Sequence, residues 1–180
     1  MATPGMTYRP IRCDVLTMSY RIVGNILVPS NGLGGVLNNK TNSFQEIQNA
    51  QLARMHMPTK LIENYDIARL VKSQIIAVCV GRREDLGPLM MARGGYQNTI
   101  PYSVFITTPI YEITGTLEWT GRFDFTAIMV EGTRDFIPLY SCTIRAILIP
   151  NVVIESPAMF INRKQVDLLA LATQKPTENS

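Results

Sequence analysis

Five basic side chains lie in short polar segments where they could bind phosphate groups or an acidic partner. They are Lys72, Arg82, Arg83, Arg163 and Lys164. Ammonium and guanidinium groups form charge-assisted hydrogen bonds with phosphate oxygens, and the sequence-independent part of nucleic-acid binding rests on such contacts. Basic residues are also ordinary in solvated turns between two apolar strands, so both interpretations stay open. These five residues are the candidate nucleic-acid or partner contacts.

No combination of residues points to catalysis. His56 is the only histidine, and it stands between Met55 and Met57, so we expect a partly buried histidine at a strand end. A nucleophilic triad or a zinc site would need further partners near it. Residues 10–78 and 101–169 are similar in sequence, and Glu63 and Glu155 occupy matching positions in these two segments. A shared structural role is therefore favoured over an acid–base pair. We therefore expect no enzyme, no catalytic residues, no metal and no cofactor.

A glycine-rich stretch covers residues 31–35. It lacks the Lys-Ser/Thr pair that closes a P-loop, and it lacks the spacing of a dinucleotide-binding fingerprint. Because it lies between two strand-like stretches, we expect a flexible hairpin turn there rather than a site that holds phosphate.

The three cysteines, Cys13, Cys79 and Cys142, are far apart and lie in apolar or mixed strand-like sequence. We expect buried, reduced thiols in a cytoplasmic protein rather than a disulfide framework. The first residues lack the basic and apolar segments of a signal peptide. No apolar run approaches the roughly 20 residues that span a bilayer, so no membrane span is expected.

Composition indicates a folded chain with unevenly distributed charge. Of the 180 residues, 46% are hydrophobic and 17% are charged. Residues 1–98 hold 11 Lys and Arg against 6 Asp and Glu, a net charge of +5, while residues 99–180 hold 6 against 8, a net charge of −2. Opposite charges would let the two halves associate head to tail, and the basic half could also contact nucleic acid.

The sequence of residues 10–78 resembles that of residues 101–169, which predicts an internal duplication. At an offset of 91, the matches are Pro10, Thr17, Tyr20, Ile22 and Gly24 with Pro101, Thr108, Tyr111, Ile113 and Gly115. At an offset of 92, they are Phe44, Pro58, Ile62 and Glu63 with Phe136, Pro150, Ile154 and Glu155. The offset returns to 91 for Leu70, Lys72, Gln74 and Ile75 with Ile161, Arg163, Gln165 and Val166.

Each copy has the pattern of curved β-structure. Apolar and polar residues alternate over residues 111–118 and 20–26, which is typical of strands buried on one face. Gly24 and Gly115 interrupt these strands midway, and we expect a bulge or sharp bend at each. We predict a mostly β protein made of two tandem small curved antiparallel sheets or barrels that are related by internal duplication.

The remaining boundaries follow from composition and from the alignment of the copies. We expect tails at 1–9 and 173–180, a first β module at 10–87, a linker at 88–100 and a second module at 101–172. Second strands are expected at 35–38 and 123–130, and third strands at 44–57 and 136–149, each ending before a proline. Fourth strands are expected at 61–63 and 152–154, followed by long fifth elements at 67–80 and 158–171. Helix is the alternative for residues 43–55 and for the end of the element at 158–171.

Each copy resembles the Sm-like small β-barrel, of the Hfq and Lsm type. The early bent strand of that family, V-x-G-x-L, is similar to residues 113–117 and 22–26. The basic turn between its last two strands is similar to residues 161–164 and 71–73. The resemblance implies a small barrel that builds rings and binds single-stranded RNA at paired loops.

The sequence therefore favours a non-catalytic assembly or accessory subunit that mediates protein–protein interaction, either with a protein partner or as a homo-oligomer. The alternative is an Sm-like RNA-binding module that uses the five basic residues. A small-ligand enzyme would need polar groups converging in a pocket between the modules.

Overall fold

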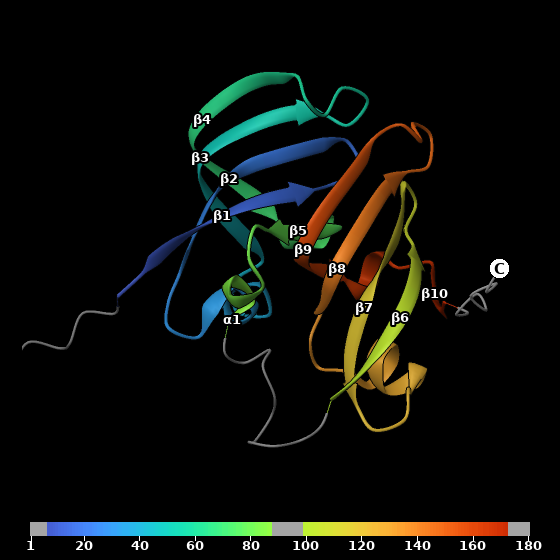
Figure 1. The fold of residues 1–180 in the computed structure, drawn as a ribbon. Coiled ribbons are helices and arrows are strands. Elements are labelled where there is room, and N and C mark those ends of the chain that lie inside the picture. The colour runs from blue at the N-terminus through green and yellow to red at the C-terminus, as the bar shows by residue number, and fades with distance from the viewer. Residues whose placement is uncertain (1–6, 88–98, 173–180) are drawn as a thin grey trace, which may run out of the picture.

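The computed structural model describes residues 7–87 and 99–172, and in them ten antiparallel strands form one continuous sheet (Figure 1). The strands are β1 (Arg9–Leu16), β2 (Tyr20–Val28), β3 (Phe44–Arg54), β4 (Leu61–Val71), β5 (Ala77–Val80), β6 (Thr99–Thr107), β7 (Tyr111–Thr120), β8 (Phe136–Ala146), β9 (Val153–Asn162) and β10 (Leu168–Leu171). The expectation of a mostly β, antiparallel protein is confirmed. The two separate sheets or barrels that we expected are joined instead into a single open sheet.

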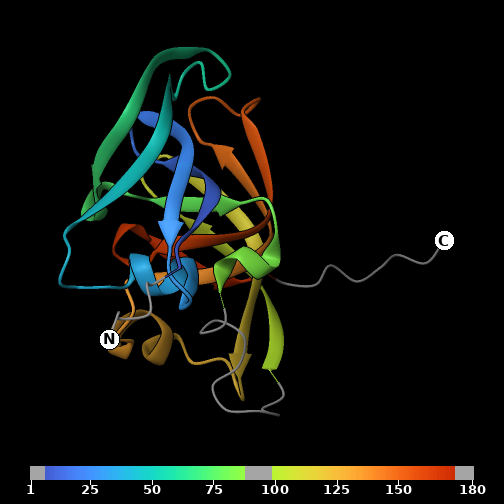
Figure 2. The ribbon, with the colours of Figure 1, turned by 90° about the vertical axis from the view of Figure 1, so that its left-hand side faces the viewer.

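The strand order of the sheet is β10-β6-β7-β8-β9-β5-β1-β2-β3-β4. The first five strands of the chain and the last five follow the same order within their own halves, so β1 to β5 correspond in position to β6 to β10. The halves meet where β5 pairs with β9, and each half curves strongly away from that junction (Figures 1 and 2). The sheet does not close, and β4 and β10 are its outer strands.

The central glycines of β2 and β7 coincide with breaks in the strand register. The pairing of β2 with β3 shifts between Val23 and Asn25, and that of β7 with β8 shifts between Thr114 and Thr116. A Cβ atom on Gly24 would lie 2.4 Å from the Ile47 side chain. The expected irregularities are confirmed, because only a residue without a side chain lets the neighbouring strand approach this closely.

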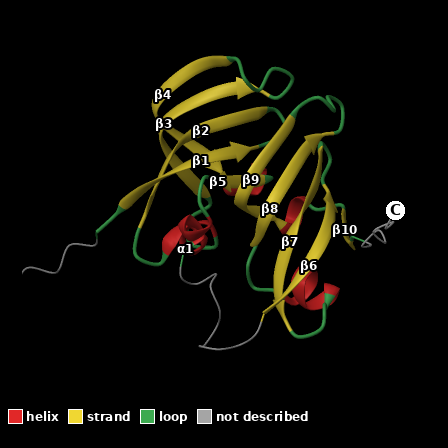
Figure 3. Cartoon of the chain, viewed as in Figure 1, coloured by secondary structure: helices red, strands yellow, loops and turns green. Residues whose placement is uncertain are grey.

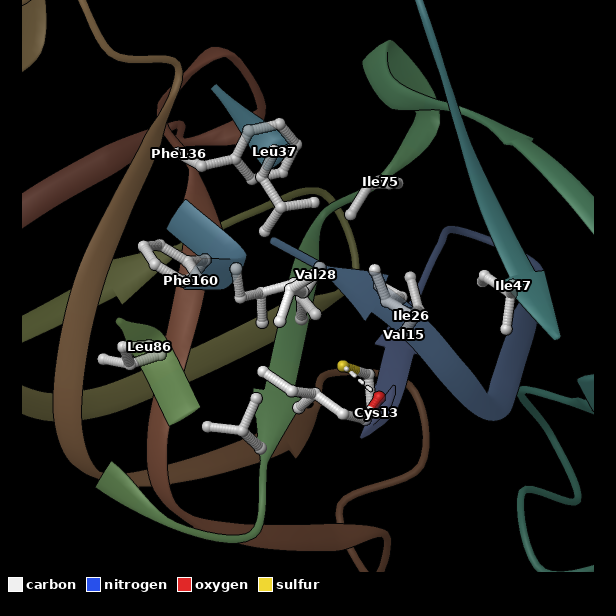
Figure 4. Packing of buried hydrophobic residues seen from close by; sticks show 14 of the residues in the cluster. Cys13, Val15, Ile26, Val28, Leu37, Ile47, Ile75, Leu86, Phe136 and Phe160 are labelled. Atoms are coloured by element: carbon white, nitrogen blue, oxygen red, sulfur yellow. Dashed lines mark hydrogen bonds between the residues drawn. The ribbon is translucent and has the colours of Figure 1, made fainter. Parts of the chain in front are cut away.

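The apolar residues pack into two clusters, one on each face of the junction. The first joins residues of β1, β2 and β3 to Leu37 and Leu86, and it also takes in Phe136 and Phe160 from the second half (Figure 4). The second consists mainly of residues from β6 to β9, together with Leu16 and Cys79 of the first half. Each cluster therefore contains side chains from both halves, so the junction is part of the core.

The segments expected as second strands are helical (Figure 3). Residues 32–37 form the α-helix α1 (Gly32–Leu37), and residues 127–131 form the π-helix η4 (Ala127–Glu131). In α1, Leu33 and Leu37 are one helical turn apart and both are buried, so this face of the helix packs into the first apolar cluster. The hairpin turn expected at the glycine-rich stretch is therefore wrong. Gly32 has φ +74° and its Cα lies against Gly87, where a side chain would not fit.

The third strands are confirmed as strands, and the helical alternative for residues 43–55 is wrong. They end at Arg54 and Ala146, several residues before the prolines, because turns follow them. The fourth strands are longer than expected, since β4 and β9 continue to Val71 and Asn162. The end of the last element is strand β10, held by pairing with β6, rather than helix. β6 begins at Thr99, inside the linker expected at 88–100. The rest of that linker, residues 88–98, lies outside the described residues. Residues 1–6 and 173–180 of the expected tails also lie outside them.

Candidate interaction surfaces

The basic turns of the two halves lie side by side at the junction. They are the 3-10 turns η1 (Lys72–Gln74) and η5 (Arg163–Gln165), each between the last two strands of its half. The Gln165 side-chain amide donates to the Ser73 carbonyl oxygen at 2.7 Å, and the Asn162 amide donates to the Ile75 carbonyl oxygen at 2.9 Å. The structure thus brings Lys72, Arg163 and Lys164 to one region, although they are distant in sequence.

Lys72 is buried and holds the end of α1. Its Nζ donates to the carbonyl oxygens of Val36 at 2.8 Å and Asn39 at 2.9 Å. Burial lowers the pKa of the Lys72 ammonium group. Val36 lies in the last turn of α1 and Asn39 lies just after it, so the ammonium group fixes the end of the helix. The Lys72 ammonium group therefore contacts the protein's own backbone rather than solvent.

Arg163 and Lys164 both pair with Asp135. Lys164 Nζ lies 2.9 Å from one Asp135 carboxylate oxygen, and Arg163 Nη2 lies 3.7 Å from the other. The Arg163 main-chain N–H also donates to the Asp135 carbonyl oxygen at 2.8 Å. Lys164 is well exposed, while Arg163 is mostly buried and its Nη1 has no hydrogen-bond partner among the described residues. Of these two cations, Lys164 is the one that solvent or a partner reaches.

Arg82 and Arg83 lie elsewhere, at the start of the 3-10 turn η2 (Arg83–Leu86). Arg82 Nε is 3.3 Å from the buried Asp85 carboxylate. Arg83 pairs with Glu118 of β7, and its guanidinium group lies 3.9 Å from the ring centroid of Tyr140. The Arg83 contacts join the end of the first half to the second half. The five basic residues therefore form two groups, and each has an acidic or carbonyl partner within the protein.

A shallow apolar hollow of 390 Å³ lies between hairpin turns from both halves. Tyr111 borders it, and its hydroxyl donates to the Thr17 carbonyl oxygen at 3.2 Å and contacts the Met55 sulfur at 2.9 Å. Burial raises the pKa of the Tyr111 hydroxyl. His56 also borders the hollow, but it is exposed in the turn after β3, so the partly buried position expected for it is wrong. Within residues 7–87 and 99–172 no three His, Cys, Asp or Glu side chains gather where they could hold a metal ion.

All three cysteines are free and buried, as expected. Burial raises the pKa of the thiols of Cys13 and Cys142 to about 12. The pKa of the Cys79 thiol is raised as well, by burial and by the nearby Asp14 carboxylate. A thiol that stays protonated at neutral pH is a poor nucleophile and a poor metal ligand, so these residues act as small apolar groups of the core.

The two outer strands of the sheet carry exposed apolar side chains. On β4 these are Leu61, Tyr65, Ile67 and Val71, and on β10 they are Leu168 and Leu171, each 47–51% exposed. An outer strand also presents main-chain N–H and C=O groups that a further strand can pair with. Sequence reasoning missed this surface, because whether a strand lies at an edge depends on pairing between distant segments.

Comparisons with models of known protein families, with curated proteins and with solved structures find no match to this chain. Among the helices of the described residues, none has the length and apolar character needed to cross a membrane.

Proposed function

We propose that this protein is a non-catalytic assembly subunit that binds other protein chains along the outer strands of its sheet. The observation that carries the proposal is the pair of apolar outer strands, β4 and β10. Strand addition at such an edge combines main-chain hydrogen bonds, which supply affinity, with side-chain contacts, which supply specificity. The buried, unpaired thiols suit a reducing compartment, so we place this activity in the cytoplasm.

We further propose that the two halves arose by duplication and that each is an Sm-like module. Equivalent hydrogen bonds support the duplication: the Thr17 N–H donates to the Tyr20 carbonyl at 2.9 Å, and the Thr108 N–H donates to the Tyr111 carbonyl at 2.9 Å. Asn49 and Ser141, at an offset of 92, both have φ +50°. Such strained positions rarely recur by chance at corresponding places. A solved structure of a related chain whose two halves superpose poorly would contradict the duplication.

RNA binding is the second candidate, favoured by the adjacency of the turns η1 and η5. Among the residues there, Lys164 is exposed whereas Lys72 is buried. If the turns bind RNA, Lys164→Met should weaken filter binding of unstructured RNA at low salt and reduce its salt dependence. Lys72→Met, measured beside it, tests whether the effect belongs to the exposed charge. No binding by the wild-type chain at low salt contradicts this candidate.

The assembly function is tested by tagging the full chain in its own cells, cross-linking it, and identifying its complexes by native mass spectrometry. The matched control is an edge-blocked double variant, Arg69→Pro with Leu171→Pro, since proline removes an edge N–H and is tolerated on outer strands. We expect the wild-type chain in a larger complex that the double variant does not enter. A wild-type chain that is strictly monomeric and binds no protein contradicts the proposed function.

A further inference from the structure

The two outer strands of the sheet, β4 and β10, occupy the same positions in their halves as the two strands that meet at the junction, β9 and β5. At the junction, β5 of the first half pairs antiparallel with β9 of the second. Because both halves follow the same strand order, β4 corresponds to β9 and β10 corresponds to β5. We propose that β10 of one molecule pairs with β4 of a second copy, so that the internal junction is repeated between molecules. This inference rests on the assembly function proposed above and names its partner.

The internal junction determines the register of this pairing. Phe44 pairs with Val71 and Phe136 pairs with Asn162, so Val71 corresponds to Asn162. Leu16 pairs with Ala77 and Thr107 pairs with Leu168, so Ala77 corresponds to Leu168. At the junction Ala77 is opposite Ile161. The corresponding pairs between molecules are Leu168 with Leu70, Leu169 with Arg69, Ala170 with Ala68, and Leu171 with Ile67.

The main-chain groups of both outer strands point the right way for this register. The Lys72 N–H donates inward to the Ser43 carbonyl at 2.9 Å. The amides of alternate residues along a strand point to opposite sides, so those of Arg69 and Ile67 point outward. The Ala172 N–H donates inward to the Ser103 carbonyl at 2.8 Å, so the amides of Leu171 and Leu169 point outward. The outward residues are the ones that the register places opposite one another.

The same register buries exposed apolar side chains against each other. Ile67 is 51% exposed and Leu171 is 48% exposed, and they would form one directly opposed pair. On the other face of the strands, the exposed Leu168 would lie opposite Leu70. At the internal junction the residues that correspond to this second pair, Ala77 and Ile161, are buried. Cross-strand apolar pairs of this kind stabilise a sheet.

Polar groups at the ends of the two strands also match. Arg69 would lie diagonal to Asp167 of the neighbouring copy, within reach of its long side chain. The exposed Gln74 corresponds to Gln165, whose amide donates to the Ser73 carbonyl at the internal junction. Between molecules, Gln74 would reach the carbonyl of Lys164 in the same way. The net charges of +5 and −2 on the two halves of the chain favour this head-to-tail contact.

A head-to-tail contact uses two different surfaces of each molecule, so it extends from copy to copy. It produces a closed ring if the rotation between copies closes and an open filament if it does not. Each variant that blocks one surface leaves the other surface intact. This property makes the proposal testable by mixing two variants.

The experiment measures the mass of the purified full-length chain by native mass spectrometry and by sedimentation velocity. Arg69→Pro removes one outward amide of β4, and Leu171→Pro removes one outward amide of β10. Arg69→Ala and Leu171→Ala are the matched controls, since they remove the same side chains and keep the amides. We expect oligomers for the wild type and both alanine variants and monomers for each proline variant. An equal mixture of the two proline variants should form a one-to-one dimer, because each supplies the intact strand that the other lacks.

A second measurement does not depend on the proline variants folding. Ala68 and Ala170 are opposed at a non-hydrogen-bonded position of the proposed register, where Cα atoms are close enough for a disulfide. Mild oxidation of the variant Ala68→Cys with Ala170→Cys should give covalent dimers and higher species, whereas Ala68→Cys with Leu171→Cys, which is out of register, should give far fewer. The three native cysteines are buried and do not interfere.

Three results overturn the inference. In the first, only Arg69→Pro dissociates the oligomer, which indicates that β4 pairs with β4. In the second, neither proline variant dissociates it and the in-register cysteines do not cross-link, which places the contact elsewhere. In the third, the wild-type chain is monomeric alone but binds a different protein through its edges, in which case the proposed assembly function stands and only the identity of the partner is wrong.

Discussion

The side chain of Asn38 pairs with the main chain of Phe136 in both directions. Its Nδ2 donates to the Phe136 carbonyl oxygen at 3.1 Å, and its Oδ1 accepts from the Phe136 N–H at 2.9 Å. Asn38 follows α1 in the first half of the chain, and Phe136 begins β8 in the second half. One amide group thus satisfies both main-chain groups at the start of a strand in the other half, which ties the halves together beside their shared core.

We expect Asn38→Ala to lower the free energy of unfolding by about 1–3 kcal/mol, since it leaves the main-chain groups of buried Phe136 without these partners. The matched control is Asn39→Ala. The Asn39 side chain is exposed and bonds only to nearby Thr41, so its loss should cost about 0.5 kcal/mol or less. Urea unfolding of both variants checks the difference, and equal losses would show that the Asn38 contact contributes nothing particular.

Gly24→Ala should destabilise the protein, by about 1–3 kcal/mol. The new Cβ would lie 2.4 Å from the Ile47 side chain and 2.8 Å from the Gln48 carbonyl oxygen, so the bulge or the core must shift. Gly81→Ala is the control, because a Cβ on Gly81 would meet no atom within 4 Å apart from its chain neighbours. Thermal unfolding followed by circular dichroism should show a lower melting temperature for Gly24→Ala only. An unchanged melting temperature for Gly24→Ala would mean that the strand relaxes freely there.

Alkaline pH should weaken the fold through its buried thiols. Burial raises the pKa of the Cys142 thiol from 9.0 to about 12. Between these values the unfolded chain has released the proton and the folded chain has kept it, so the folded state binds more protons. Its stabilisation is complete below pH 9 and is lost as the pH rises toward 12, by about 1.4 kcal/mol per pH unit for one thiol.

The measurement compares urea unfolding of the wild type and of Cys142→Ala at about pH 8 and about pH 10.5. The variant lacks this thiol, so its free energy of unfolding should fall less steeply with pH, even if its stability at the lower pH is reduced by the missing sulfur. Parallel pH dependences for the two proteins would rule out a contribution from Cys142.

Lys72 and Lys164 should differ in their effect on stability, although both are basic residues of equivalent turns. Lys72→Met removes an ammonium group that donates to two backbone carbonyls, so we expect a loss of about 1–3 kcal/mol. Lys164→Met removes one exposed member of an ion pair with Asp135, for which we expect about 1 kcal/mol or less. Chemical unfolding of the two variants provides the test, and a larger loss for Lys164→Met would contradict the structural role given to Lys72.

Local patterns determined much of the fold from the sequence alone. Alternation along residues 20–26 and 111–118 identified β2 and β7, and Gly24 and Gly115 identified their irregular centres, because side-chain periodicity and the lack of a Cβ are properties of the residues themselves. The burial of the three cysteines followed in the same way from their apolar surroundings. The turn expected at 31–35 and the strand expected at 35–38 are wrong, since the six-residue apolar segment with three glycines that forms α1 has no periodicity that separates strand from helix.

Only the tertiary structure decided how the halves and the charged residues are used. The sequence shows Lys72, Arg163 and Lys164 as similar basic residues, but packing buries the first and leaves the last exposed. Nothing in the order of residues states that β5 pairs with β9 or that β4 and β10 are left outermost. Pairing of distant strands is a property of the folded chain, because it depends on which edges meet once each half has curved around its core. The surface on which the proposed function rests therefore became visible only when the strands were placed in order.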